Sequence, residues 1–313
     1  MLEALAIRLA SLQRREDPRI DKVHVSIFAA DHGIAAEGVS AFPQAVTQDM
    51  VKNFAAGGAA ANVLTRQINA CFEVIDVGMV QAVDLPNVLA QRAGPGTANF
   101  KLHAAMTEVQ LGIALAAGRL AAERAAANGA DLFVGGEMGI ANTSSASALA
   151  AALLQLPTAA ITGAGTGLNA AQIDHKTAVI AQALELHADT LDTPLAILQA
   201  LGGFEIAALV GAYIAAAQHD LPSLVDGFIS SVAALLAVRI APGCADWLFY
   251  GHRSAEKGHT IVLDALGAEP LLNLNMRLGE ASGALMAVPI LQTACRLHNE
   301  MATFAQANIT TTG

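Results

Sequence analysis

The chain has 313 residues, of which 54% are hydrophobic and 14% are charged, and its formal net charge is −10. This length is sufficient for one large core or for two unequal domains. The negative charge, with no Lys/Arg run, argues against nucleic acid as a partner, because binding to a phosphate backbone needs clustered positive charge. The mean hydropathy of +0.47 is high, but apolar stretches such as 206–217 and 232–238 end well before the ~20 residues of a membrane span. We therefore expect a non-membrane protein.

Residues 1–10 form an amphipathic helical pattern with an early acid and no signal-peptide cleavage pattern, which predicts a cytoplasmic protein. The three cysteines, Cys71, Cys244 and Cys295, are scattered and apolar-flanked. This argues against a disulfide framework and against a Cys-type zinc site. We expect them to be buried reduced thiols.

Strand-like and helix-like segments alternate along the chain. Strands are predicted at 23–29, 71–77, 131–135, 224–227 and 247–251. Helices are predicted at 43–57 with Pro43 in the first turn, from a cap at Asn142 or Thr143 to Leu154, from Asn169, and at 281–307. Strands that end in glycine and polar residues and then lead into helices are typical of a parallel sheet. The fold class is therefore α/β, with a parallel Rossmann-like sheet flanked by helices, and ligands should bind at the carboxyl ends of the strands.

The two ends of the chain are predicted to form a second, smaller unit. The first helix and the long pattern from Ala281 to Ala307 would pack together beside the sheet. The expected organisation is a large α/β domain at 20–280 that holds the active site, and a smaller helical domain made of 1–19 and 281–313.

Two glutamates stand in unusually glycine-rich settings, Gly135-Gly136-Glu137-Met138-Gly139 and Gly279-Glu280-Ala281-Ser282-Gly283. Glycine is tolerated where the chain bends sharply or where a ligand approaches the backbone closely. A carboxylate in an apolar, glycine-lined turn is also a common way to raise a base's pKa toward neutrality. For either site alone, a turn with a solvated acid is an equally good interpretation, but two such sites in one chain favour function.

A glycine-rich turn precedes the helix predicted from Asn169. It consists of Gly163, Ala164, Gly165, Thr166 and Gly167. Free backbone N–H groups at a helix N-terminus can hold a phosphate. The turn matches neither the Rossmann fingerprint nor the P-loop. Lys176, two helical turns further on, could add positive charge, although a solvated surface lysine is the simpler interpretation.

Polar residues at other predicted strand ends extend this set. Asp226 is suited to bind ribose hydroxyls, and Ser254 could cap a helix or contact substrate. His252 and His259 are seven residues apart, which disfavours a metal site. The sequence Asp31-His32-Gly33 has no nucleophile elbow to complete a catalytic triad. Two poised carboxylates, a phosphate-type turn and a ribose-type acid, without a metal or cofactor, indicate group transfer on a phosphorylated sugar or nucleotide.

A series of motifs resembles one enzyme family, the nicotinate-nucleotide–dimethylbenzimidazole phosphoribosyltransferases. They occur in order over nearly the whole chain: ADHGIAAEGVS (30–40), PQAVT (43–47), GEMGIANT (136–143), GGFEIA (202–207), DGFI (226–229), GHRSAE (251–256), RLGE (277–280) and MATF (301–304). The resemblance implies a homodimeric α/β enzyme without cofactor. Such an enzyme moves ribose 5-phosphate from nicotinate mononucleotide to 5,6-dimethylbenzimidazole and gives α-ribazole 5′-phosphate and nicotinate, a step in assembling the nucleotide loop of cobalamin.

The resemblance also implies roles for individual residues. Glu280 matches the family's catalytic base and Glu137 its second active-site glutamate. The expected substrate-binding residues are Ser40 and Gln48 on the benzimidazole side, Asp226, Ser254, Leu278 and the 163–167 turn (Gly163, Gly165, Thr166, Gly167) on the nucleotide side, together with Met138, Gly139, Lys176 and Gly279.

This sequence departs from the family pattern at a few places. Ala164 stands where the family commonly has Arg, and Ala281 where it commonly has Gly. Family members usually begin with a further segment that includes Lys-Pro-x-Gly-Ser-Leu-Gly, and the chain opens after that point. Two alternatives stay open. One is a paralogue that uses another base or a phenol as acceptor, and the other is a protein that binds a nucleotide or base without turnover. The presence of Glu280 argues against the second.

Overall fold

The computed structural model describes residues 1–309. Its centre is a six-stranded, all-parallel sheet with the strand order β3-β2-β1-β4-β5-β6. The strands are β1 (Val23–Ala30), β2 (Cys71–Gly78), β3 (Val88–Ala90), β4 (Leu132–Met138), β5 (Ser223–Val225) and β6 (Leu248–Tyr250). The prediction of a parallel Rossmann-like sheet is confirmed. β1 and β4 are neighbours at the point where the strand order reverses, which is where ligands bind in such sheets.

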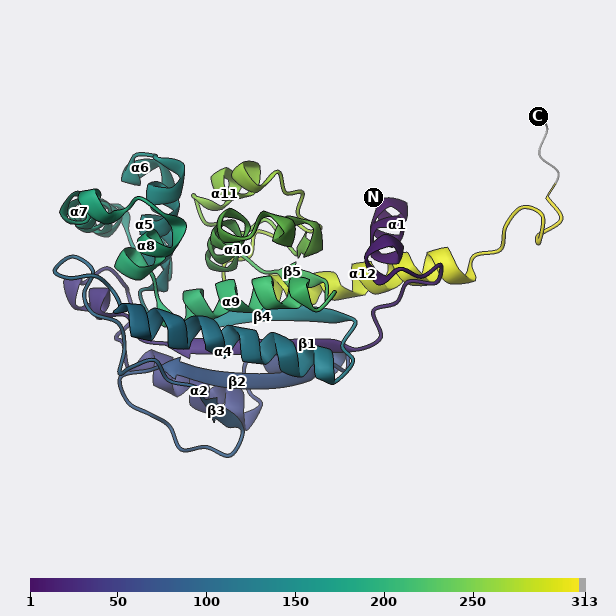
Figure 1. Cartoon of the computed structure of the whole chain (residues 1–313), viewed down its shortest axis with the longest axis horizontal. Helices are drawn as coiled ribbons and strands as arrows, with labels where there is room; N and C mark the ends of the chain where they lie inside the picture. Colours follow the sequence, from purple (N-terminus) through teal and green to yellow (C-terminus); the bar gives the residue numbers. More distant parts are fainter. Residues whose placement is uncertain (310–313) are drawn as a thin grey trace.

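Helices cover both faces of the sheet (Figure 1). The α-helices are α1 (Leu2–Gln13), α2 (Val46–Ala56), α3 (Ala60–Gln67), α4 (Glu108–Ala127), α5 (Asn142–Leu154), α6 (Thr158–Ile161), α7 (Ala170–Leu186), α8 (Pro194–Leu201), α9 (Phe204–Gln218), α10 (Phe228–Ile240), α11 (His259–Leu266) and α12 (Ser282–Glu300). Short 3₁₀ turns lie at Gly33–Glu37, Ala188–Thr190 and Pro242–Trp247.

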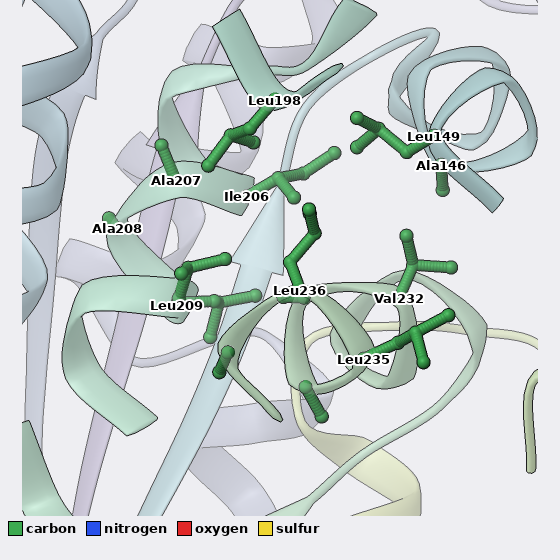
Figure 2. Packing of buried hydrophobic residues seen from close by; sticks show 14 of the residues in the cluster. Ala146, Leu149, Leu198, Ile206, Ala207, Ala208, Leu209, Val232, Leu235 and Leu236 are labelled. Atoms are coloured by element: carbon green, nitrogen blue, oxygen red, sulfur yellow. The ribbon is translucent and has the colours of Figure 1, made fainter. Parts of the chain in front are cut away.

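The strands alternate their side chains between two hydrophobic clusters. Phe28 of β1 points into a cluster with α4, α5, α8, α9 and α10, and Ile27 points into another with α1, α2, α3 and α12. Figure 2 shows leucine, isoleucine and valine side chains of α5, α8, α9 and α10 meeting in the first cluster. All eight residues of β1 are buried. A strand that is covered on both faces reads as a continuous apolar run, which explains why the sequence predicted it correctly.

The helices α4 and α9 cross in close contact because glycines stand at the crossing. A Cβ on Gly118 of α4 would overlap the carbonyl oxygen of Ala208, and a Cβ on Gly211 of α9 would overlap that of Leu115. The two backbones therefore touch without intervening side chains. Thr107 fixes the start of α4, where its hydroxyl accepts from the Gln110 backbone N–H at 3.2 Å.

The first and last helices lie side by side (Figure 1). Arg8 of α1 reaches the sheet: its guanidinium donates to the Leu248 carbonyl at 2.9 Å and stands 4.2 Å from the centre of the Phe249 ring. The predicted helix 281–307 was too long, because α12 ends at Glu300. The division into 20–280 and a helical unit of 1–19 plus 281–313 stays a prediction, and its residues 310–313 lie outside the described part.

Two smaller expectations were wrong. α2 begins at Val46, and Pro43 lies in the preceding turn, where its carbonyl accepts from the Val46 N–H at 3.1 Å. Cys71 is exposed at the start of β2, whereas Cys244 and Cys295 are buried. In the part of the chain that the structure describes, none of the helices combines the length and apolar character needed to cross a membrane.

A partly buried ion pair joins the sheet to α4 and gives a pH-dependent contribution to stability. Burial alone would raise the pKa of Glu73, but the His24 ring 3.4 Å away and the hydrogen bonds from Arg124 and Ser26 outweigh it and lower the pKa to about 2. The carboxylate form therefore stabilises the fold above the unfolded pKa of 4.5, and this contribution is lost as the pH falls from there toward 2. We expect Glu73→Gln to lower the free energy of unfolding by about 2–3 kcal/mol at pH 7, as measured by urea denaturation.

The pH dependence of that difference separates the charge from simple side-chain loss. The difference between wild type and Glu73→Gln should shrink as the pH is lowered below 4.5. Glu123→Gln is the matched control, because Glu123 pairs with Arg119 on the exposed side of α4 and such pairs contribute only about 0–1 kcal/mol. A constant difference between about pH 7 and about pH 3 would contradict the assignment.

Candidate active site

A cleft of about 680 Å³ opens at the carboxyl ends of the strands. β4 supplies Glu137 directly, Asp226 follows β5, and His252 follows β6. The predicted site residues that line it are Glu137, Met138, Gly139, Gly165, Thr166, Asp226, Ser254, Leu278, Gly279 and Glu280. A cleft at this end of a parallel sheet is the usual place for a ligand in such folds.

Glu137 lies within strand β4, which corrects the expectation of a turn. Gly135 and Gly136 are strand residues. Glycine stands at both positions because the side chains of Leu209 and Ile27 leave no space for a Cβ. The Glu137 side chain is buried and accepts a hydrogen bond from the Asn142 amide. Burial and the nearby carboxylates of Glu205 and Asp226 raise its pKa to about 8. At pH 7 most molecules therefore hold a proton on Glu137.

The expectation that Asn142 or Thr143 caps α5 was wrong. The structure instead has Ala141 at the N-cap position, in the left-handed conformation with φ 77° and without a side-chain hydrogen bond. The Asn142 side chain is used to bind Glu137. The helix goes without a side-chain cap, and the glutamate gains a fixed orientation.

Glu280 stands in a turn where three consecutive residues have left-handed backbones. The φ angles are 81° at Gly279, 59° at Glu280 and 59° at Ala281. This conformation costs about 1–2 kcal/mol for each residue other than glycine. The Ser282 N–H donates to the Gly279 carbonyl at 2.9 Å and closes the turn. Gly279 has no room for a side chain, because a Cβ would stand 2.7 Å from the Glu137 carboxylate. The turn thus places the two glutamates next to each other.

The Glu280 carboxyl group is set up to accept a proton. It is 7% exposed, and burial raises its pKa, with a smaller opposing effect from the Ala61 backbone and a further rise caused by Asp226. Its Oε2 atom has no hydrogen-bond partner among the described residues. A base with a raised pKa and an unpaired oxygen suits proton removal near neutral pH.

The Ala281 methyl group fits the strand beneath it. A Cβ on Gly136 would come within 2.8 Å of the Ala281 Cβ, so the strand glycine leaves space for the methyl. Ala281 itself is fully buried. Packing therefore accommodates Ala281, which stands where the family commonly has glycine. Its backbone conformation is still one that glycine adopts more easily.

The glycine-rich turn leads into α7 as predicted. Asn169 caps the helix by accepting from the Gln172 N–H at 3.0 Å. Gly165 and Gly167 have positive φ angles of 54° and 117°. A Cβ on Gly163 would overlap the Glu256 carboxylate. Gly163 and Gly167 do not line the cleft, whereas Gly165 and Thr166 do.

Lys176 is fully buried, so the interpretation as a surface lysine was wrong. Its Nζ donates to the Thr143 hydroxyl at 2.7 Å, and a Cβ on Gly165 would stand 3.4 Å from that nitrogen. Burial lowers the pKa of Lys176 to about 8, and Glu256 opposes this effect. The ammonium group thus lies directly behind the turn, where an anion at Gly165 would stabilise its charge.

Asp226 and the two histidines form the wall behind Ser254. The Asp226 Oδ1 accepts from the Ala284 N–H at 2.8 Å at the start of α12 and stands 3.7 Å from the His252 Nε2. Burial raises the pKa of Asp226, and His252 opposes this. His259 accepts from the Ser254 N–H at 2.8 Å. Its other ring nitrogen lies 2.9 Å from the Ser231 hydroxyl, so both nitrogens are occupied by protein groups.

Ser40 and Gln48 lie outside the cleft lining. The Ser40 hydroxyl is 3.5 Å from that of Thr166, so it borders the turn. Gln48 of α2 lines a neighbouring pocket of about 510 Å³ together with Asp31 and Gln44. Their proposed place on the acceptor side stays a prediction.

Several residues of the site were not singled out from the sequence. Glu205 is one of them: it forms a fully buried pair with His32, with 2.6 Å between carboxylate and ring nitrogen, directly behind Gly139. Thr143, Glu256 and Arg277 line the cleft. Glu205 could have been noticed as an acid within the apolar run that follows Gly202 and Gly203. Thr143, Glu256 and Arg277 were marked in the sequence only by lying within the motifs that match the family.

Comparisons with known proteins agree with this geometry. A family model described as phosphoribosyltransferase matches residues 1–309. A relative from Azotobacter vinelandii, named nicotinate-nucleotide–dimethylbenzimidazole phosphoribosyltransferase, is 60% identical over 100% of this chain and 89% of its own. A relative of the same name from Pseudomonas fluorescens is 58% identical over 98% and 88%. The crystal structure of the Thermus thermophilus enzyme of that name has a TM-score of 0.93 at 44% identity, covering 99% of this chain and 92% of that one. Identity at this level over the whole described chain shows that it belongs to the nicotinate-nucleotide–dimethylbenzimidazole phosphoribosyltransferase family.

Proposed function

We propose that this protein transfers ribose 5-phosphate from nicotinate mononucleotide to 5,6-dimethylbenzimidazole, giving α-ribazole 5′-phosphate and nicotinate for the nucleotide loop of cobalamin. The observation that carries the proposal is the placement of Glu280, with its raised pKa and unpaired oxygen, in one cleft with the turn before α7. The names of the relatives support the same substrates.

The reaction needs one base and no acid at the leaving group. The bond from ribose C1′ to the nicotinate ring nitrogen breaks, and its electron pair stays on that nitrogen, which changes from a pyridinium to a neutral pyridine. One nitrogen of the benzimidazole forms the new bond to C1′. The other nitrogen gives up its proton to Glu280. Attack on the face opposite the leaving group inverts C1′ from β to α.

The two glutamates differ in what they can do at neutral pH. With its pKa raised to about 8, Glu137 retains its proton at pH 7, so it can donate a hydrogen bond and is a poor base. Glu280 stands next to it because the Gly279 turn packs on the Glu137 carboxyl group. A neutral Glu137 also avoids a second negative charge beside the base. We assign proton removal to Glu280 and orientation of the reactants to Glu137.

The remaining residues divide between the two substrates. We place the phosphate at Gly165 and Thr166, the two residues of the turn that line the cleft, with Lys176 supplying the positive charge behind them and Gly167 shaping the end of the turn. The ribose lies near Asp226 and Ser254. Leu278, Met138, Gly139 and Gly279 form the walls around the reacting centre. Gly163 shapes the turn without touching substrate, because Glu256 packs against it. Ser40 and Gln48 face the acceptor.

We further propose a cytoplasmic homodimer. On α4, Val109, Ile113 and Leu120 are exposed and share a face, and the nearby Leu102 is exposed as well. A row of exposed apolar side chains on one helix is typical of a protein–protein interface. The division into a large domain at 20–280 and a small one at 1–19 with 281–313 is part of the same proposal.

The test is release of nicotinate from nicotinate mononucleotide, measured by chromatography in the presence of each of a panel of acceptors. We expect release with 5,6-dimethylbenzimidazole and close analogues. Release with adenine or a phenol but not with benzimidazoles would favour the paralogue that uses another acceptor. Absence of release with every acceptor, combined with a clear thermal shift by the mononucleotide, would favour the non-catalytic binding protein.

A further inference from the structure

The charge of the cleft is strongly one-sided. Four of its lining residues are acids, namely Glu137, Asp226, Glu256 and Glu280, and of these Glu137 holds its proton at pH 7 and adds no charge. Within the described residues 1–309, Arg277 is the one arginine or lysine in that lining. The buried Lys176 lies behind the turn and does not line the cleft. Any anionic group that enters away from the turn therefore meets carboxyl groups and a single guanidinium.

The backbone on both sides of Arg277 is held in place. The Met276 carbonyl accepts from the Ala255 N–H at 2.9 Å. On the other side, the Gly279 carbonyl accepts from the Ser282 N–H at 2.9 Å, within the turn that carries Glu280. The Arg277 side chain itself is exposed, and none of the hydrogen bonds or ion pairs within residues 1–309 involves it. A fixed backbone with an uncommitted guanidinium is suited to ligand binding.

The donor carries two anionic groups at opposite ends. Its phosphate has the turn and Lys176. Its pyridinium ring carries a carboxylate, which would be repelled by the acids of the cleft unless a cation meets it. A guanidinium matches a carboxylate with two parallel hydrogen bonds. A carboxamide in the same place has one oxygen and one NH₂ group. It therefore cannot accept both of the hydrogen bonds that the guanidinium donates.

We propose that Arg277 binds the carboxylate of the nicotinate ring and makes the protein select nicotinate mononucleotide over nicotinamide mononucleotide. The inference rests on the proposed function and adds the residue that recognises the leaving group. It assigns Arg277 to specificity and leaves the proton transfer to Glu280.

Calorimetric titration with the two mononucleotides tests the assignment, because they differ only in the carboxylate and the carboxamide. Wild type should bind nicotinate mononucleotide about 10- to 100-fold more tightly, the usual range for a hydrogen-bonded charged pair. Arg277→Gln should remove that preference by weakening only the nicotinate compound, and Arg277→Lys should restore part of it. Arg253→Gln is the control: Arg253 donates to the Thr260 hydroxyl and lies outside the lining, and its replacement removes the same charge.

The results separate this inference from the proposed function. Equal weakening of both mononucleotides by Arg277→Gln would place the guanidinium on the phosphate and overturn the proposal. An unchanged preference in Arg277→Gln, or the same loss in Arg253→Gln, would also overturn it. The proposed function is judged independently by nicotinate release from wild type, so a failure of carboxylate recognition leaves a measured transferase activity intact.

Discussion

Glu280→Gln is expected to lower kcat for nicotinate release by about 100- to 10,000-fold, the usual contribution of a positioned general base. Gln has the same shape and cannot take the benzimidazole proton. The KM for nicotinate mononucleotide should change little, because the proton is transferred in the transition state and not on binding. Steady-state kinetics with both substrates would measure the two effects separately, and circular dichroism would confirm that the variant is folded.

The pH profile and the second glutamate provide the controls. Because the pKa of Glu280 is raised and the base must be unprotonated, the wild-type rate should rise with pH through that pKa and then level off. The residual rate of Glu280→Gln should lack this rise. Glu137→Gln replaces a side chain that is already neutral at pH 7, so its loss should be about tenfold or less. A larger loss in Glu137→Gln than in Glu280→Gln would exchange the two roles.

Gly118→Ala is expected to cause the largest loss of stability from a single methyl group. The added Cβ would overlap the Ala208 carbonyl at the crossing of α4 and α9. Both helices contribute buried residues to the first cluster, and Figure 2 shows the part of it around Ala208 of α9, so separating the helices disturbs the packing. Overpacking of this kind costs about 1–3 kcal/mol, and more where backbone atoms must move. Chemical denaturation would measure the free energy of unfolding.

Another glycine of α4, Gly112, is the matched control for Gly118, and its replacement by alanine should raise stability instead of lowering it. Gly112 is also in α4, and a Cβ there would meet no atom within 4 Å. Gly112→Ala should therefore stabilise the protein by about 0.8–1 kcal/mol through helix propensity alone. If Gly118→Ala were as stable as Gly112→Ala, the close approach of α4 and α9 would not exist in solution.

The sheet could be predicted where a strand is long and buried on both faces. β1 met that condition and β2 met it over its last five residues, and both were predicted within one residue of their ends. β4 is buried as well, but its glycines hid its last three residues, Gly136 to Met138. β3 has only three residues, none of which is buried, so it has neither the length nor the burial that makes a strand visible in the sequence. The end of α12 was misplaced because Met301 and the following residues continue its composition, although the helix stops at Glu300.

The site could be predicted as a set of residues but not as an arrangement. Glycine spacing and the ends of strands indicated Glu137, Glu280, Asp226 and the turn before α7. The sequence could not show that Glu137 lies inside a strand or that Lys176 is buried, because both facts depend on what packs from elsewhere in the chain. The second pocket at Gln48 likewise depends on α2 lying against the end of β1.

The left-handed turn at Gly279, Glu280 and Ala281 implies a conflict between activity and thermal stability. Two residues with side chains hold a conformation that glycine and asparagine adopt at lower cost. Selection for heat resistance alone would therefore favour glycine or asparagine at 280, and the surviving variants would have lost the base. Directed evolution of a more stable form would need to screen for turnover at every round, or leave this turn unchanged.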